Sequence, residues 1–296
     1  MTGISQSVQV SPPERSEGSA GDLSTLLSVS ITVRYPGKSP VLRNCALEVK
    51  SGEILGLVGQ SGSGKSTLAL AILGLLGRTR ATLEGRIDFQ AADLLAMSER
   101  DLRNLRGSSL SLVLQSPLAS LNPALRVRTQ LREAWRAHRS AASAQGDCDL
   151  AMRQALQSVS LPADPDFLHK RSSQLSVGQA QRVLIAMAVM HRPALMIADE
   201  ATSALDVITQ SEILQLFATL NRETGMSILY ISHDLPSVAG ICHRIAILNE
   251  GEIVECGPTA QIFAAPTHPY TRRLMSSLPQ IPGRAESLSR VQTASR

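Results

Sequence analysis

Residues 59–67, with the sequence GQSGSGKST, constrain the fold of this chain more than any other stretch. They fit the pattern G-x-x-x-x-G-K-[ST], in which the backbone N–H groups of a glycine-rich loop surround a polyphosphate. Residues 53–58 before the loop are typical of a buried strand, and residues 68–73 after it of a helix. An ordinary Gly/Ser-rich turn is the alternative, but the flanking strand and helix favour a nucleoside triphosphate site. The predicted binding residues are Gly59, Gln60, Ser61, Gly62, Ser63, Gly64, Lys65, Ser66 and Thr67, with Ser66 also a ligand of Mg²⁺.

Composition favours a globular protein without membrane-spanning helices or disulfide bonds. The 296 residues are 43% hydrophobic and 18% charged, which suits one large globular domain or a core with a subdomain. The apolar runs are shorter than the roughly 20 residues of a membrane-spanning helix, and no basic start leads into one, so we expect a cytosolic chain without a signal peptide. The four cysteines are far apart and form no C-x-x-C pair, which predicts lone reduced thiols. A net charge of +4 permits contact with an anionic surface without arguing for it.

The order of segments predicts an α/β fold. Residues 1–22 are rich in Ser, Gly, Pro and Glu, which predicts a disordered tail. Residues 117–174 are polar and helical, with interruptions near 144–147 and 162–165. Strands are expected at 27–33 and 45–49, joined by a turn at 36–37, and again at 194–198, 227–231 and 244–248, with helices at 183–191 and 210–219. This alternation indicates a mostly parallel sheet covered by helices.

Two segments in the second half carry candidate chemistry. Residues 194–200, ALMIADE, form an apolar strand that ends in two acids, where Asp199 can hold Mg²⁺ and Glu200 can polarise an attacking water. Adjacent acids at a strand end are as often solvated loop residues. Residues 175–182, LSVGQAQR, combine a polar, glycine-containing turn with a helix start, which is either a phosphate-binding design or an ordinary Ser cap.

Two further features follow these segments. Residues 203–206, SALD, come directly after the acids, and His233 follows the strand expected at 227–231. A lone histidine after a strand is more often structural than catalytic.

The order of phosphate loop, Gln115, LSVGQ, ADE, SALD and His233 resembles the nucleotide-binding subunit of ATP-binding cassette (ABC) transporters, over roughly residues 26–279. The resemblance implies a phosphate-loop (RecA-like), mostly parallel α/β core with an antiparallel β subdomain and an inserted helical subdomain at about 117–180. The ATPase domain would span 23–256, followed by an extension at 257–282 and a flexible tail at 283–296.

The resemblance also implies roles for single residues. Tyr35 would stack on the adenine of ATP, and Gln115 would reach Mg²⁺ and the γ-phosphate while sensing a membrane partner. Glu200 would act as the general base and His233 would contact the γ-phosphate, with ATP and Mg²⁺ as the cofactors. Ser176, Gly178 and Gln179 would bind the ATP held by an opposite subunit, and Asp206 would help to join the two subunits.

The LSVGQ turn departs from the family at Val177, where glycine is usual. A β-branched residue resists positive φ, so the turn either has negative φ there or is weakened. Ala201 stands where many relatives have proline, which we expect to be harmless.

The C-terminal segment indicates a branch of the family. Residues 257–279 include GPT, IF and PTHPYT, and they resemble the extension of oligopeptide, dipeptide and nickel importer ATPases, as do residues 116–123. A Pro-rich surface strap is the alternative interpretation. Some relatives carry an iron–sulfur centre in this extension, but only Cys256 lies nearby here, so none is expected.

This branch implies a set of partners. They are a second ATPase subunit, identical or paralogous, two transmembrane permease subunits and, indirectly, an external solute-binding protein, with the chain peripheral at the cytoplasmic face of the inner membrane. The solute would be a di- or oligopeptide, or nickel or another metal chelate. The alternative is a soluble ABC-class ATPase of a metabolic or nucleic-acid-associated complex. No long coiled coil or second cassette supports that alternative, so we expect no nucleic acid partner.

Basic residues at helical spacing in the middle region have two interpretations. Arg128, Arg132, Arg136 and Arg139 recur opposite Leu131, Trp135 and His138. A surface for lipid headgroups or nucleic acid is possible, but a solvated helix face is the favoured interpretation.

Overall fold

The computed structural model describes residues 24–138 and 145–277. The predicted tails at 1–22 and 283–296 lie outside the described residues. Within the described ranges, none of the helices combines the length and apolar character needed to cross a bilayer.

Two sheets form the framework of the molecule. An antiparallel sheet has the strand order β2-β1-β4-β5, and a second sheet has the order β10-β9-β3-β8-β7-β6, parallel except for β10. The antiparallel strands are β1 (Thr25–Arg34), β2 (Leu42–Lys50), β4 (Thr82–Phe89) and β5 (Ala92–Asp93). The others are β3 (Ile54–Val58), β6 (Leu110–Val113), β7 (Leu195–Asp199), β8 (Ser227–Ser232), β9 (Arg244–Asn249) and β10 (Glu252–Pro258). The predicted fold class is therefore confirmed.

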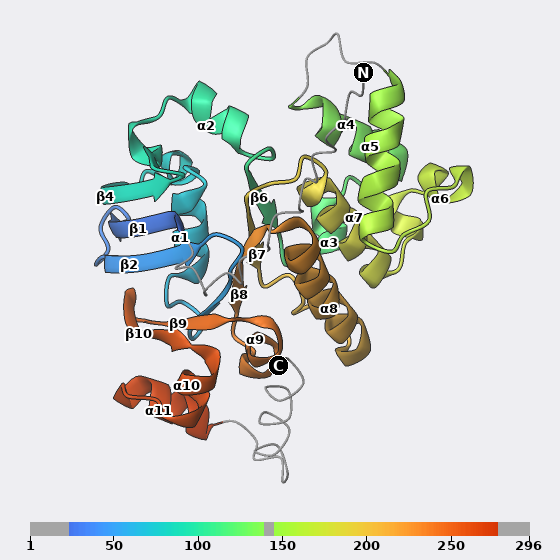
Figure 1. Ribbon diagram of the computed structural model, residues 1–296. Coiled ribbons are helices and arrows are strands. Elements are labelled where there is room, and N and C mark those ends of the chain that lie inside the picture. Colours follow the sequence, from blue (N-terminus) through green and yellow to red (C-terminus); the bar gives the residue numbers. More distant parts are fainter. Residues whose placement is uncertain (1–23, 139–144, 278–296) are drawn as a thin grey trace, which may run out of the picture.

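Apolar side chains on both faces make the parallel strands the centre of the molecule. Ile54 and Val58 of β3 enter one core, whereas Leu55 and Leu57 enter another, because successive side chains of a strand point to opposite faces. One core contains the antiparallel sheet and α1 (Lys65–Ile72), which Figure 1 shows between the two sheets. The other core contains α7 (Val177–Val189), α8 (Val207–Thr224) and α9 (Leu235–Ile241).

The predicted helices are present in the structure, but their predicted bounds differ from the observed ones. Helices α1, α7 and α8 begin at residues 65, 177 and 207, which is three to six residues before the predicted starts. Their first turns mix Ser, Thr, Gly and Gln with exposed apolar residues such as Val207 and Ile208, so the buried apolar spacing that marks a helix is clear only from the second turn. The strands β4, β5, β6 and β10 were not predicted from the sequence.

A helical subdomain lies to one side of the parallel sheet (Figure 1). It contains α3 (Pro117–Ser120), α4 (Val127–Arg136), α5 (Gln145–Ser158), α6 (Pro165–His169) and α7, and α7 packs against α3, α4 and α5. The interruption predicted near 144–147 is wrong for residues 145–147, because α5 begins at Gln145, and residue 144 lies outside the described residues. The break predicted at 162–165 separates α5 from α6, as expected.

The basic side of α4 is not a fully solvated face. Arg128 and Arg132 are half-buried, and each has an Nε atom that is buried without a hydrogen-bond partner. Together with Arg136 they act electrostatically on Cys148 of α5, so this side of α4 faces α5. The expectation of a solvated stripe is therefore corrected, because α5 covers part of it. Arg139 lies outside the described residues.

The described part of the C-terminal extension is α10 (Thr259–Ala264) and α11 (Pro269–Ser276). Ile262 and Tyr270 join the core on the α8 side of the parallel sheet. Glu255 of β10 accepts hydrogen bonds from the Thr267 N–H at 2.7 Å, the Thr267 hydroxyl at 2.9 Å and the His268 N–H at 3.0 Å. The partial burial of Glu255 would raise the pKa of its carboxyl, but these hydrogen bonds outweigh that effect and lower the pKa from 4.5 to about 2.

We expect Glu255 to hold α11 in place. Because the carboxyl has a lower pKa when folded, its stabilising effect is complete above pH 4.5 and is lost as the pH falls towards about 2. The protection of the α11 amides, which is the factor by which they exchange more slowly than the intrinsic rate at the same pH, should fall over that range. Glu255→Ala should cause the same loss of protection, seen as faster exchange at pH 7, whereas Glu223→Ala, at an exposed position of α8, should not. Unchanged exchange in Glu255→Ala would contradict this anchor.

All four cysteines of the chain are free thiols. Cys45, Cys148 and Cys242 are buried, and burial raises the pKa of each of these thiols. The expectation of lone reduced thiols is therefore confirmed.

Candidate functional site

The phosphate loop lies between β3 and α1. Gly64 has φ 111°, and a Cβ there would come within 2.7 Å of the Leu42 side chain, so the loop needs glycine at this position. The Ser63 N–H donates to the Gln60 carbonyl at 3.2 Å and the Leu68 N–H to the Gly64 carbonyl at 2.9 Å. The loop therefore turns directly into a helix whose free N–H groups point at the loop.

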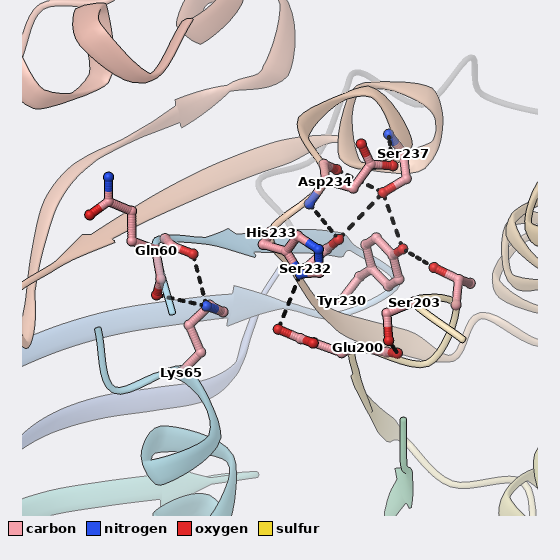
Figure 2. A network of polar contacts seen from close by, with 11 residues as sticks. Gln60, Lys65, Glu200, Ser203, Tyr230, Ser232, His233, Asp234 and Ser237 are labelled. Carbon is pink, nitrogen blue, oxygen red and sulfur yellow. Dashed lines mark hydrogen bonds and ion pairs between the residues drawn. The ribbon is translucent and has the colours of Figure 1, made fainter. Parts of the chain in front are cut away.

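Lys65 is held inside the loop. Its ammonium donates to the carbonyl oxygens of Gly59 at 2.8 Å and Gln60 at 3.0 Å (Figure 2). Burial lowers the pKa of Lys65, and the charges of Glu200 and Asp199 oppose that shift. The lysine is therefore a positive charge in a water-poor position at the centre of the loop.

A hollow of about 380 Å³ opens beside the loop. It brings together Tyr35 from the end of β1, the loop and first turn of α1, and Glu200 from the end of β7. Two residues that sequence reasoning missed, Lys38 and Val41, also line it, and both belong to the turn between β1 and β2 that carries Tyr35. The lining residues from the loop and α1 are Ser61, Gly62, Gly64, Lys65, Ser66 and Thr67. The predicted binding residues Gly59, Gln60 and Ser63 do not line the hollow.

Asp199 ends β7 next to the loop. Burial raises the pKa of its carboxyl, and a hydrogen bond from the Ser66 hydroxyl opposes the shift. Its Oδ1 atom is buried and has no hydrogen-bond partner. A hydroxyl and an orphaned carboxylate oxygen, side by side, fit the oxygen ligands of Mg²⁺, which takes few protein ligands beside substrate phosphates.

Glu200 has an unusual backbone. Its φ of 49° lies in the left-handed region, which is sparsely populated for residues other than glycine. The Glu200 N–H donates to the Ile231 carbonyl at 2.9 Å, and its own carbonyl accepts from Ser203 N–H at 3.1 Å and Ser203 Oγ at 3.0 Å. These contacts hold the bend that directs the carboxylate to the hollow.

His233 meets Glu200 across the ends of β7 and β8. Its Nδ1 lies 3.3 Å from Glu200 Oε1, and its side chain is 59% exposed against 22% for Glu200 (Figure 2). The histidine is therefore free to contact a group in solution while it holds the carboxylate.

Behind this pair lies a buried hydroxyl network that the sequence did not reveal. The Tyr230 hydroxyl lies 2.9 Å from Thr202 Oγ1 and 3.2 Å from Ser237 Oγ (Figure 2). Burial raises the pKa of Tyr230, so it stays a neutral phenol. It ties the segment after Glu200 to the segment after His233, and an aromatic residue within an apolar strand gave no sequence signal of this.

Gln115 lies two residues beyond the end of β6, and Asp199 is the last residue of β7. The two strands are parallel neighbours, with Val113 of β6 paired with Ala198 of β7. Both residues are thus at the carboxyl edge of the parallel sheet. Gln115 is exposed and does not line the hollow.

The LSVGQ turn lies apart from the hollow. Ser176 caps α7 by accepting from the Gln179 N–H at 3.1 Å, while Gln179 Oε1 accepts from the Ser176 N–H at 3.2 Å. A Cβ on Gly178 would come within 2.7 Å of Thr209 Cγ2, so the first turns of α7 and α8 touch there. Asp206 caps α8, and the Thr209 backbone and hydroxyl lower its pKa. None of these residues lines the hollow.

Val177 fits this turn without strain. It is the first residue of α7 and is absent from the described residues with positive φ. A β-branched residue is therefore tolerated, and the first alternative, a turn with negative φ, is confirmed.

The chain is similar to known proteins over most of its length. Residues 42–203 match the model of the ABC transporter family, and residues 254–295 match that of the oligopeptide/dipeptide transporter C-terminal region. The glutathione import ATP-binding protein GsiA of Salmonella paratyphi A is 38% identical over 276 residues, or 91% of this chain and 44% of that protein. Its counterpart in Escherichia coli O1:K1 is 37% identical over the same shares. The chain thus spans less than half the length of these curated relatives.

Solved structures show the same fold. The ATP-binding cassette MJ0796, solved as a dimer in a post-hydrolysis state with ADP and Pi, has a TM-score of 0.68 at 27% identity, covering 79% of this chain and 98% of that one. CbiO1 from Clostridium perfringens, part of the ABC transporter complex cbiONQ, has a TM-score of 0.71 at 26% identity, covering 90% and 99%. The family match covers more than half of the chain and agrees with the phosphate loop, the LSVGQ turn and the paired acids. This chain belongs to the ABC transporter family.

Proposed function

We propose that this chain is the ATP-hydrolysing subunit of a membrane importer of short peptides. The observation that carries the proposal is the convergence of Lys65, Ser66 and Glu200 on one hollow beside the phosphate loop, with Asp199 hydrogen-bonded to Ser66. The C-terminal match to oligopeptide/dipeptide transporters and the glutathione importer relatives support the peptide class, since glutathione is itself a short peptide. Nickel or metal chelates are the second solute class.

ATP would lie with its adenine on Tyr35 and its phosphates within the loop. Backbone N–H groups and the Lys65 ammonium would bind the β- and γ-phosphates. Lys38, which lines the same hollow, adds a second positive charge beside them. Ser66, Asp199 and Gln115 would hold Mg²⁺, which neutralises charge on the phosphates.

Hydrolysis follows from the position of Glu200. Its carboxylate accepts a proton from a water molecule as that water attacks the γ-phosphate, and ADP and phosphate leave. His233 keeps the carboxylate in place through the 3.3 Å contact and presents its exposed ring to the γ-phosphate.

A complete site would need two subunits. The LSVGQ turn is separate from the hollow of its own chain, so Ser176, Gly178 and Gln179 would contact ATP held by a partner subunit, either a copy or a paralogue. Val207 and Ile208, which follow Asp206, are 82% and 74% exposed, an unusual number of large apolar side chains beside a polar turn. We infer that the partner subunit covers them.

This arrangement makes Val207→Asp a selective change. The isolated chain should still bind ATP, because its own loop is intact. Hydrolysis by the assembled complex should fall at least about tenfold, since a carboxylate at a buried interface has no partner. Leu150→Asp on α5, where the side chain is 57% exposed, is the control and should hydrolyse ATP normally. Full hydrolysis by Val207→Asp would rule out this face as the subunit interface.

Closure of the two subunits on ATP, and their opening after hydrolysis, would move two transmembrane permease subunits. An external solute-binding protein would supply the solute, and this chain would lie peripherally at the cytoplasmic face of the cell membrane. Fractionation of cells tests this location. The chain should sediment with membranes and be released by detergent but not by nuclease. A chain that stays in the supernatant, or is released by nuclease, would favour the soluble metabolic or nucleic-acid-associated ATPase instead.

A further inference from the structure

We propose that the helical subdomain carries a second binding site, for a small amphiphilic carboxylate, between α4, α5 and α6. A hollow of about 170 Å³ lies there. Figure 1 shows these three helices together, on the far side of the parallel sheet from β1, β2 and β4. The nucleotide hollow shares no lining residue with it, so the inference does not depend on the proposed function.

The charged groups of this hollow are mainly basic. Arg128, Arg153 and His169 line it, against one acid, Asp149. The Arg128 Nη2 donates to Asp149 Oδ1 at 3.2 Å, so the charges of these two residues cancel. Arg153 therefore gives the hollow one net positive charge, and the ring of His169 can donate a further hydrogen bond.

These basic groups have unused donors. The side chains of Arg153 and His169 make no hydrogen bond or ion pair with any residue in the described part of the chain. The Arg128 Nε is buried and also lacks a partner. A buried N–H without an acceptor is costly, so an acceptor for the Arg128 Nε would be favourable, and the exposed donors of Arg153 and His169 could bind the same anion.

The rest of the lining is apolar, and this favours a carboxylate with a hydrocarbon part over a bare inorganic anion. Met152, Leu156 and Leu168 line the hollow beside the basic groups. Asp149, Met152, Arg153 and Leu156 have the i, i+3, i+4, i+7 spacing, so the charged and apolar groups share one face of α5. The volume is large enough for several water molecules, which suits a carboxylate on a short chain. A guanidinium binds such a carboxylate through two parallel hydrogen bonds.

The test is titration of the full chain with sodium hexanoate, followed by calorimetry or by NMR of the ligand. Hexanoate should saturate one site with a dissociation constant in the millimolar range, as suits so small a ligand. Acetate should bind more weakly because it lacks the chain, and 1-hexanol should not bind because it lacks the charge. Arg153→Gln should weaken hexanoate binding by about tenfold or more, because it removes hydrogen bonds to a charged group. His169→Gln should weaken it less.

Arg103→Gln, an exposed arginine of α2 (Glu99–Leu105), is the matched control and should bind hexanoate normally. Unfolding profiles of the variants show whether each still folds, and both arginines are exposed, so we expect normal folding. The proposal is overturned by absence of saturable hexanoate binding, by equal binding of 1-hexanol, or by unchanged affinity in Arg153→Gln. Tighter binding of inorganic phosphate, or Arg153-dependent binding of anionic lipid vesicles without hexanoate binding, would assign the basic groups to phosphate chemistry or to a lipid surface and would also overturn it.

Discussion

Glu200→Gln is expected to lower the rate of ATP hydrolysis by about 10²- to 10⁴-fold, the usual contribution of a general base, with ATP affinity kept. Glutamine has the shape of glutamate and can keep the backbone contacts to Ile231 and Ser203, but its amide cannot accept the proton of the attacking water. Because ATP stays bound and uncleaved, the variant should also remain in the closed, ATP-bound dimer. Phosphate release at steady state and ATP binding at equilibrium are the two measurements.

Glu223→Gln, on the exposed side of α8, is the control and should hydrolyse ATP at the rate of the unchanged chain. Near-normal hydrolysis by Glu200→Gln would refute the role of Glu200 as the base. A loss of ATP binding together with hydrolysis would mean that Glu200 mainly shapes the site.

Lys65→Met should strongly weaken ATP binding. Methionine fits the buried position, but it carries no charge and no donor for the phosphates. Loss of two charge-assisted hydrogen bonds predicts a fall in ATP affinity of at least about 100-fold. Titration with a fluorescent ATP analogue measures this loss.

Lys170→Met is the matched control, since Lys170 lies in the helical subdomain over the Phe167 ring. The contacts of Lys65 to the Gly59 and Gln60 carbonyls also hold the loop, so thermal unfolding without nucleotide separates a loosened loop from lost phosphate contacts. ATP affinity equal to that of the unchanged chain would contradict the assignment of this loop.

Several parts of the fold could be predicted from the sequence because they are short, continuous apolar runs. Residues 54–58, 195–199 and 227–232 are apolar on both faces of the strand, and such short runs identify a buried parallel sheet. Strands β4 and β10 are half-exposed and polar, and β6 has only four residues, so none of them shows such a run. The starts of α7 and α8 were missed because their first turns mix Val177, Val207 and Ile208 with Gly, Gln and Thr, without the apolar spacing of a helix.

The candidate site was predictable where a local motif carries it. The glycines and Lys65 are neighbours in sequence because one loop surrounds the phosphates. Glu200 and His233 are 33 residues apart, and only the parallel pairing of β7 and β8 brings their side chains within 3.3 Å. Lys38, Val41 and Tyr230 have no motif, because their positions depend on the packing of the β1–β2 turn and of a buried strand.

The central claim is that this chain drives a membrane importer, and a pull-down tests it most directly. The tagged chain would be purified from gently solubilised native membranes, and the proteins that accompany it identified by mass spectrometry. We expect two multi-spanning permease subunits and a second ATPase subunit, with ATP hydrolysis by the purified assembly. Recovery of soluble partners alone would contradict the account and would leave an ATPase whose closure drives a process other than transport.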